Sequence, residues 1–266
     1  MSDPKNPSAP PVAPVGDGEH VGGPPDAGRF VPYGRSLPPG RGAAWIGDAW
    51  RLLRAQPGMW AAALILMLVA YIVLSLIPLV NFFADLLVPF ACAGLALAAD
   101  EQRRTGNFEL RSLLGGFERH MVPLLVVGVA TFLAGIVFLA VLAVFLGADV
   151  FGAMTGGFQP EPSTVMTLRF WLAVMIGLAL MLPVICATYL APQLIVLHDQ
   201  PAVVAMKMSL AATVKNVLPG LVFGLCALGM LIVSMIPLML GLLITVPILA
   251  ITNYTVYRDI FVDSDS

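Results

Sequence analysis

Apolar and polar positions along this chain form long blocks that repeat three times. Each repeat opens with a short stretch in which apolar residues recur at helical spacing and basic residues occupy the other face. A proline follows (Pro57, Pro123 or Pro219), and a long apolar stretch comes after it. Because one crossing of a bilayer needs about 20 apolar residues, each stretch is long enough to cross and return. The pattern predicts three helical hairpins, each preceded by a short cytoplasmic-side amphipathic helix.

Six transmembrane helices follow from these blocks. Between Lys215 and Arg258 lie 42 residues without a formal charge. As one helix they would be about 63 Å long, about twice the thickness of a bilayer core. This stretch must fold back, and Pro237 with the nearby Gly241 is its turn signal. The predicted fold class is an all-α membrane protein with spans at residues 59–80, 82–99, 121–147, 170–197, 217–236 and 238–257.

Composition supports this interpretation and divides the chain. The sequence is 59% hydrophobic and 11% charged, whereas about a quarter of the residues of a soluble domain are charged. Residues 1–42 contain ten Pro and eight Gly, so we expect a disordered cytoplasmic tail there. We expect the membrane domain at 43–261 and a short disordered C-terminus at 262–266.

The positions of the basic residues predict the orientation. With these spans, 13 of the 14 Lys and Arg residues fall on one side, and only Arg169 falls on the other. The positive-inside rule then places both termini in the cytoplasm. The basic stretches are candidates for anionic lipid headgroups, although each has fewer cations than a specific lipid site usually needs. The candidate residues are Arg51, Arg54, Arg103, Arg104, Lys207 and Lys215.

Few residues in the sequence are suited to catalysis or metal binding. Asp85 falls in the first hairpin, where capping a helix start or facing water explains it better than proton transfer. A second group stands on the cytoplasmic side without the spacing of a metal site such as HExxH. Its members are Asp100, Glu101, Glu118, His120, His198 and Asp199. We therefore predict no catalytic, cofactor-binding or metal-binding residues, and no enzyme. Three cysteines (Cys92, Cys186 and Cys226) lie in apolar stretches and are expected to pack as small hydrophobic residues.

Several local features leave alternatives open. Residues 45–54 could form a helix lying among lipid headgroups or one packed beneath the bundle. Pro89, Pro192 and Pro247 are expected to bend the returning helices. The GxxxG from Gly220 to Gly224 could support packing within the chain, which we favour, or dimerisation.

Several short motifs resemble an uncharacterised group of proteobacterial six-span inner-membrane proteins, similar in layout to the YciC-like family. The motifs are Trp50-Arg51-Leu52-Leu53-Arg54-Ala55-Gln56-Pro57, Ile77-Pro78-Leu79, Pro89-Phe90-Ala91-Cys92-Ala93-Gly94, Leu113-Leu114-Gly115-Gly116-Phe117, Ala205-Met206-Lys207-Met208-Ser209-Leu210, Asn216-Val217-Leu218-Pro219 and Tyr257-Arg258-Asp259-Ile260-Phe261. The resemblance covers roughly residues 43–261. It implies an integral inner-membrane protein of unknown activity and transfers no catalytic residues.

The functional prediction is a non-enzymatic membrane protein that organises or assists components of the cell envelope. Its expected partner is the lipid bilayer, with other proteins or further copies of the chain as candidate partners, and not nucleic acid. The alternative is a transporter or channel component for a small molecule or ion, which the repeats and proline-broken helices would suit.

Overall fold

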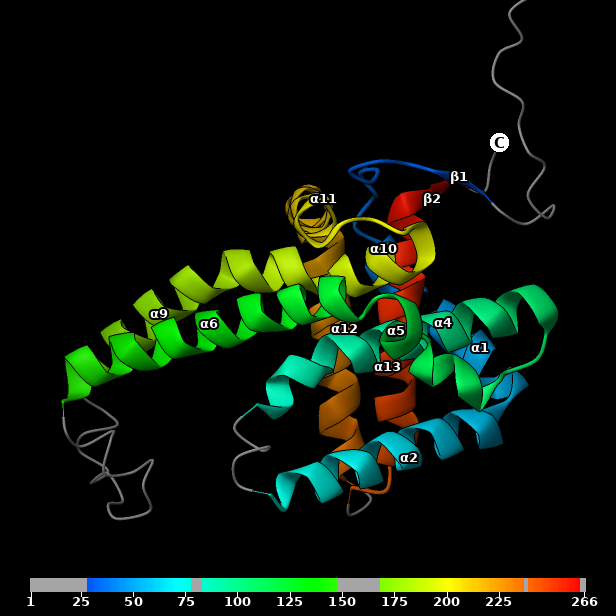
Figure 1. The fold of residues 1–266 in the computed structure, drawn as a ribbon, viewed down its shortest axis with the longest axis horizontal. Helices are drawn as coiled ribbons and strands as arrows, with labels where there is room; N and C mark the ends of the chain where they lie inside the picture. The colour runs from blue at the N-terminus through cyan, green and yellow to red at the C-terminus, as the bar shows by residue number, and fades with distance from the viewer. Residues whose placement is uncertain (1–27, 78–82, 148–167, 237–238, 264–266) are drawn as a thin grey trace, which may run out of the picture.

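We describe the protein from a computed structural model that covers residues 28–77, 83–147, 168–236 and 239–263 (Figure 1). Within these ranges the chain is almost entirely helical, and the two strands are short. An all-α protein was the prediction, and it is confirmed. The turns expected around Pro78 and Pro237, and nearly all of the external loop predicted at 148–168, lie outside the described residues.

The helices follow the three repeats. The first repeat contains α1 (Arg41–Ala55), α2 (Pro57–Ser75), the 3-10 helix η1 (Ala84–Leu87) and α4 (Val88–Thr105). The second contains η2 (Leu110–Leu114), α5 (Gly115–Arg119), α6 (Met121–Leu146), α9 (Leu168–Tyr189) and α10 (Ala191–His198). The third contains α11 (Ala202–Lys215), α12 (Val217–Met235) and α13 (Leu242–Phe261). A short helix thus precedes each of α2, α6 and α12.

One residue with a non-helical backbone separates each short helix from the long helix that follows. Gln56 (φ −143°, ψ 63°), His120 (φ −125°, ψ 25°) and Asn216 (φ −113°, ψ 32°) are these residues. Pro57, Pro123 and Pro219 follow within the first turn of the long helix, where the missing proline N–H costs no helical hydrogen bond. All three breaks are therefore followed by the same sequence feature, a proline in the first turn of the long helix.

The side chain at each break is held by a distant segment. Gln56 Nε2 donates to the carbonyl of Gly106 (2.6 Å), just beyond the C-terminus of α4. His120 Nε2 lies 2.8 Å from Asp199 Oδ1, just beyond α10. Asn216 Oδ1 accepts from the backbone N–H of Leu37 (2.9 Å) in the N-terminal segment.

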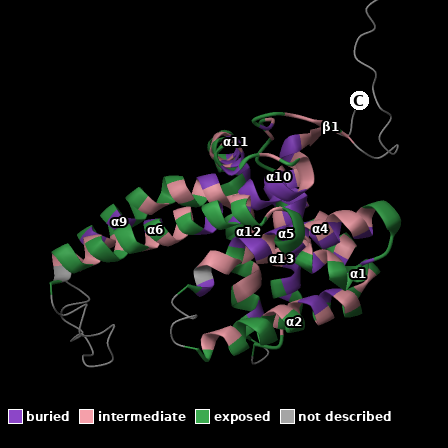
Figure 2. Cartoon of the chain, viewed as in Figure 1, coloured by how far each residue is buried: buried purple, intermediate pink, exposed green. Residues whose placement is uncertain are grey.

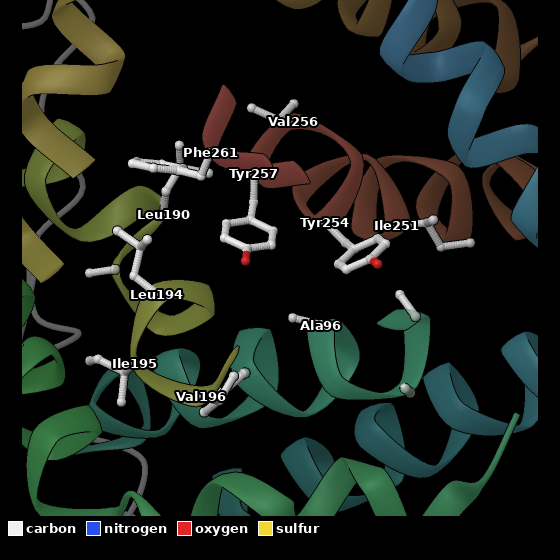
Figure 3. Close-up of a cluster of buried hydrophobic side chains, with 14 of the residues drawn as sticks. Ala96, Leu190, Leu194, Ile195, Val196, Ile251, Tyr254, Val256, Tyr257 and Phe261 are labelled. Atoms are coloured by element: carbon white, nitrogen blue, oxygen red, sulfur yellow. The ribbon is translucent and has the colours of Figure 1, made fainter. Parts of the chain in front are cut away.

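The hydrophobic core lies where the three repeats converge (Figure 2). Leu194, Ile195 and Ile251 are fully buried there, and Tyr254 and Tyr257 are nearly so. Figure 3 shows these side chains from α10 and α13 packed together above α4. The core thus joins the ends of helices from different repeats and does not run along their whole length.

Beyond this core the long helices are apolar and exposed. Four helical stretches are long and apolar enough to cross a membrane: Pro57–Ser75, Met121–Phe145, Phe170–His198 and Val217–Met235. Within an apolar 18-residue segment of each stretch, only 11–17% of the residues are buried by the rest of the protein. In water such surfaces would aggregate, whereas lipid tails cover them without cost. The protein is therefore a membrane protein.

The long helices extend from the core in different directions. The pair α6 and α9 packs side by side and runs across the view in Figure 1, whereas α12 and α13 run down it. Packing between the pairs is concentrated at the shared core.

The two ends of the described chain meet, which corrects the predicted boundaries at residues 42 and 262. Strand β1 (Arg29–Phe30) pairs antiparallel with β2 (Val262–Asp263). Residues 31–35 continue this contact, because Val31 N–H donates to the Phe261 carbonyl and Arg35 N–H to that of Ile260. Residues 28–42 are thus part of the folded domain, and so are Val262 and Asp263; residues 1–27 and 264–266 lie outside the described residues.

The prolines of α4, α10 and α13 occupy two kinds of position in their helices. Pro89 and Pro192 stand in the first turn of α4 and α10 and begin those helices, whereas Pro247 lies inside α13. The expected bend is thus replaced at Pro89 and Pro192 by a helix start. Between α9 and α10 the chain breaks at Leu190, whose N–H donates to the hydroxyl of Ser209 on α11 (3.0 Å). The same hydroxyl donates to the Cys186 carbonyl (2.7 Å), so one side chain joins the two backbone groups that the break separates.

Candidate anion-binding site

The site is built around a carboxylate in the last turn of α13. The Asp259 side chain is only 9% exposed. It accepts hydrogen bonds from Arg41 Nε (2.7 Å), Trp45 Nε1 (2.7 Å) and Arg35 Nη2 (3.2 Å). A buried carboxylate needs such partners, and here all three come from the N-terminal segment and α1. Asp259 therefore anchors one end of the chain to the other.

Helix α1 reaches this position because of a glycine. Gly42 lies so close to α12 that a Cβ on it would be 2.2 Å from the Pro219 carbonyl oxygen. Trp45, Ala49 and Leu53 then form the buried face of α1, whereas Trp50 is exposed. Of the two interpretations of residues 45–54, the structure supports a helix packed against the protein core.

A cavity of about 370 Å³ opens beside Asp259, and we call it the arginine cavity. Five arginines line it, from the N-terminal segment, α1, α4 and α13, against two aspartates. The charged lining residues are Arg35, Arg41, Asp48, Arg51, Arg103, Arg258 and Asp259. The excess of positive charge in a partly enclosed space favours an anion, and guanidinium groups match the geometry of a phosphate or carboxylate.

The arginines are held in place by hydrogen bonds inside the cavity wall. Arg41 and Arg51 both pair with Asp48. The hydrogen bond to Asp259 raises the pKa of Arg41. Since a base with a raised pKa keeps its charge until the pH rises through that value, Arg41 stays charged at all physiological pH values.

The structure brings together only part of the predicted basic set. Arg51 and Arg103 line the arginine cavity. Arg104 pairs with Asp100 on its own helix (2.8 Å), and the Lys215 ammonium donates to the Tyr33 carbonyl (3.2 Å). Arg54 and Lys207 are exposed and lie outside the cavity lining. Of the six candidate residues, Arg51 and Arg103 are the two that line the arginine cavity, and headgroup binding by the set stays a prediction.

Sequence reasoning missed the other members of the site. Arg35 and Arg41 were assigned to a disordered tail, and Arg258 and Asp259 only marked the end of the last span. The partners Arg35 and Asp259 are 224 positions apart, so no spacing rule connects them. The available signal was the arginine at 41 directly before an amphipathic stretch with Trp45.

A second cavity, of about 420 Å³, lies among α4, α9, α10, α12 and α13, and we call it the apolar cavity. Its walls are mostly apolar side chains such as Cys92, Leu95 and Phe223. Two amides interrupt them. Gln193 is 1% exposed, and within the described part of the chain neither atom of its amide has a hydrogen-bond partner, and the buried oxygen of Asn253 has none there either.

Tyr254 separates the two cavities, since it lines both. Its hydroxyl donates to Asp100 Oδ1 (2.8 Å) and accepts from Arg103 Nε (3.2 Å). The ring of Tyr254 therefore faces the apolar cavity while its hydroxyl belongs to the charged side.

The two histidines predicted near the cytoplasmic side have different hydrogen-bond partners. His120 pairs with Asp199, and this hydrogen bond lowers the pKa of the Asp199 carboxyl. His198 Nε2 is hydrogen-bonded to the Tyr257 hydroxyl. Among the described residues, no three His, Cys, Asp or Glu side chains converge closely enough to hold a metal ion. Asp85 lies in η1, and its side chain is outside what the structure describes.

The GxxxG face of α12 packs against nothing within the described chain. A Cβ placed on Gly220 or Gly224 would meet no atom within 4 Å. The expectation that these glycines support packing within the chain is therefore wrong, because α1 and α13 contact other faces of α12.

Comparison of the whole chain with protein-family models, with curated proteins and with solved structures finds no match in any of the three.

Proposed function

We propose that this chain is a non-enzymatic protein of the bacterial inner membrane that binds an anionic headgroup in the arginine cavity and so organises or assists envelope components. The observation that carries the proposal is the convergence of five arginines on one cavity next to apolar, exposed helices. A phosphate-bearing lipid presents the matching chemistry, with an anionic head at the membrane surface and an apolar tail. The predicted kinship with six-span inner-membrane proteins is part of this proposal.

We further propose six spans in three returning pairs, with both termini in the cytoplasm. The support comes from the ties at the helix breaks. Gln56 precedes α2 and contacts Gly106 beyond α4, so if α2 crosses the membrane, the segment η1–α4 has to bring the chain back. The His120–Asp199 contact makes the same demand on α6 and α9–α10.

The third pair follows from two contacts. Asn216 precedes α12 and contacts Leu37, and the N-terminal segment that contains Leu37 pairs with Val262 beyond α13. If α12 crosses, α13 crosses back. At 20 residues α13 is about 30 Å long, close to the thickness of a bilayer core, whereas the uncharged part of α4 (residues 88–99) is about 18 Å long and needs the residues before it to complete the crossing.

The headgroup proposal is tested with full-length protein in nanodiscs of phosphatidylcholine, titrated with short-chain phosphatidylglycerol and, separately, with inorganic phosphate. We expect phosphatidylglycerol to raise the melting temperature saturably, and the effect to weaken as salt rises. A lipid site responds to phosphatidylglycerol and a free-anion site to phosphate alone. The variants Arg51→Gln and Arg103→Gln should each weaken the response about tenfold, the worth of one charged hydrogen bond.

Matched controls are Arg54→Gln and Lys207→Gln, which remove exposed cations outside the cavity. If these controls weaken the response as much as the cavity variants do, binding follows overall charge, and the proposed site is wrong.

Transport is the second candidate, because the apolar cavity lies among helices of all three pairs. Its described lining includes no charged side chain, so coupling to an ion would need residues from elsewhere. Flux of a small solute into proteoliposomes that is lost in Pro247→Ala would favour transport over the organising role.

A further inference from the structure

The apolar cavity contains an amide whose hydrogen-bonding capacity is entirely unused. Gln193 lies in the first turn of α10 and is 1% exposed. Both its Nε2 and its Oε1 lack partners. Leaving one buried polar atom unpaired is costly, and native proteins seldom leave two on one side chain. The Gln193 amide is therefore available to a molecule in the cavity.

The lining defines what that molecule is like. Among the described lining residues none carries a formal charge, so an ion would be desolvated without compensation. Two tyrosines also line the cavity: the Tyr254 hydroxyl is already occupied by Asp100 and Arg103, whereas Tyr189 contributes a further hydroxyl group to the lining. Among the buried atoms of the described lining residues, three have no hydrogen-bond partner: the Gln193 amide nitrogen, which is a donor, and the side-chain oxygens of Gln193 and Asn253, which are acceptors.

We propose that the apolar cavity binds a neutral, membrane-soluble molecule with an apolar body and a hydroxyl group. A hydroxyl can donate to Gln193 Oε1 and accept from Gln193 Nε2 at the same time, which satisfies both orphan atoms. The cavity volume of about 420 Å³ is within the usual range of small-molecule sites. All the walls come from the predicted spans, so the ligand enters from the lipid phase.

This inference does not depend on the headgroup site. The ligand is uncharged, and its contacts are on α4, α9, α10, α12 and α13, away from the arginines. Ordered water is the competing occupant, since water also fills polar gaps in buried sites. Water and a hydroxyl-bearing amphiphile differ in whether an apolar body adds affinity.

The test uses full-length protein in nanodiscs made only of phosphatidylcholine, with a diazirine-bearing octanol as the photoreactive probe. We expect saturable labelling that maps to residues 92–96, 189–193 or 249–254. Unlabelled 1-octanol should compete at least tenfold better than n-octane, because only the alcohol pairs with Gln193. In Gln193→Leu the affinity for octanol should fall about tenfold, and the alcohol and the alkane should compete equally.

Thr131→Val is the matched control, a polar-to-apolar change in α6 outside the cavity, and it should label like the natural protein. If Gln193→Leu does not fold, Asn253→Leu is the second variant, and it should also weaken octanol binding. Labelling that does not saturate, octane competing as well as octanol against the natural protein, or unchanged binding in both leucine variants would overturn the proposal.

Discussion

Ser209 shows how much of this fold can depend on a single hydroxyl. It is fully buried on α11 and completes the backbone of a different helix, between the Cys186 carbonyl and the Leu190 N–H. Membrane helices can break only where something re-satisfies the separated backbone groups. The break between α9 and α10 therefore depends on Ser209, a residue on the next helix of the chain.

Ser209→Ala should lower the free energy of unfolding by about 1–3 kcal/mol, because the buried Leu190 N–H loses its partner and the Cys186 carbonyl keeps a longer hydrogen bond from the Thr213 hydroxyl (3.4 Å). Thermal unfolding of the purified protein in mild detergent measures this. Ser75→Ala is the control, since Ser75 bonds only to the Ile72 carbonyl of its own helix at the surface. Equal losses in the two variants would mean that the Ser209 bridge contributes nothing particular to stability.

Gln193 should behave in the opposite way. Its amide has no partner in the protein, so Gln193→Leu removes a desolvated polar group and breaks no hydrogen bond. We expect the unfolding free energy of the ligand-free protein to rise by about 1–3 kcal/mol. Asn216→Leu is an instructive contrast, because the Asn216 side chain makes three hydrogen bonds and its loss should destabilise. A destabilised Gln193→Leu would show that the amide is satisfied in the isolated protein.

At the scale of the helices, hydrophobic patterning predicted what each element is but not what it touches. The short helices before α2, α6 and α12 were predictable because their apolar residues recur at 3.6-residue spacing beside basic residues. The inclusion of residues 28–42 in the folded domain was not predictable from hydrophobic patterning. It depends on contacts of Arg35 and Arg41 with Asp259, more than 200 positions away, and composition alone favoured disorder.

The candidate site, too, was only partly predictable from the sequence. Arg51 and Arg103 were recognisable as basic residues next to spans, but nothing local distinguished them from Arg54 and Arg104. The distinction arises from which face of α1 and α4 meets α13, and that is decided by close approaches such as that of Gly42 to α12. The periodicity of apolar residues indicates which face of a helix is buried, but it does not indicate which other helix packs against that face.

Exposed apolar residues on the long helices should be necessary for insertion and not for folding of the core. Leu66 is 53% exposed in the middle of α2. Leu66→Arg should reduce membrane insertion by about 2.5–3.5 kcal/mol, the cost of an arginine at a span centre. The measurement is the fraction of protein in washed membranes. Leu114→Arg, at an equally exposed leucine of η2, should insert normally; failure of both variants alike would point to a general folding defect.

At the scale of the whole molecule, the three helix pairs make a strong prediction about sidedness. In a background without the natural cysteines, Asn107→Cys should resist a membrane-impermeant maleimide applied to intact cells, since the proposed topology puts the segment after α4 on the cytoplasmic side. Ser163→Cys, in the predicted external loop, should be labelled. Both should react once the membrane is permeabilised. Labelling of Asn107→Cys in intact cells would place the segment after α4 outside the cell. Gln56 and Gly106 would then lie on opposite sides of the membrane, which contradicts the proposal that the first helix pair returns to the side where it began.

The ties at Gln56, His120 and Asn216 have a consequence for how such a chain could have arisen. In the proposed topology each pair ends on the face where it began, so a gene could lose or duplicate the coding segment for a whole pair and leave the sidedness of everything downstream unchanged. Deleting one long helix, by contrast, would invert every later segment. Three similar pairs in a row are the outcome expected when copying is tolerated only in units of two helices.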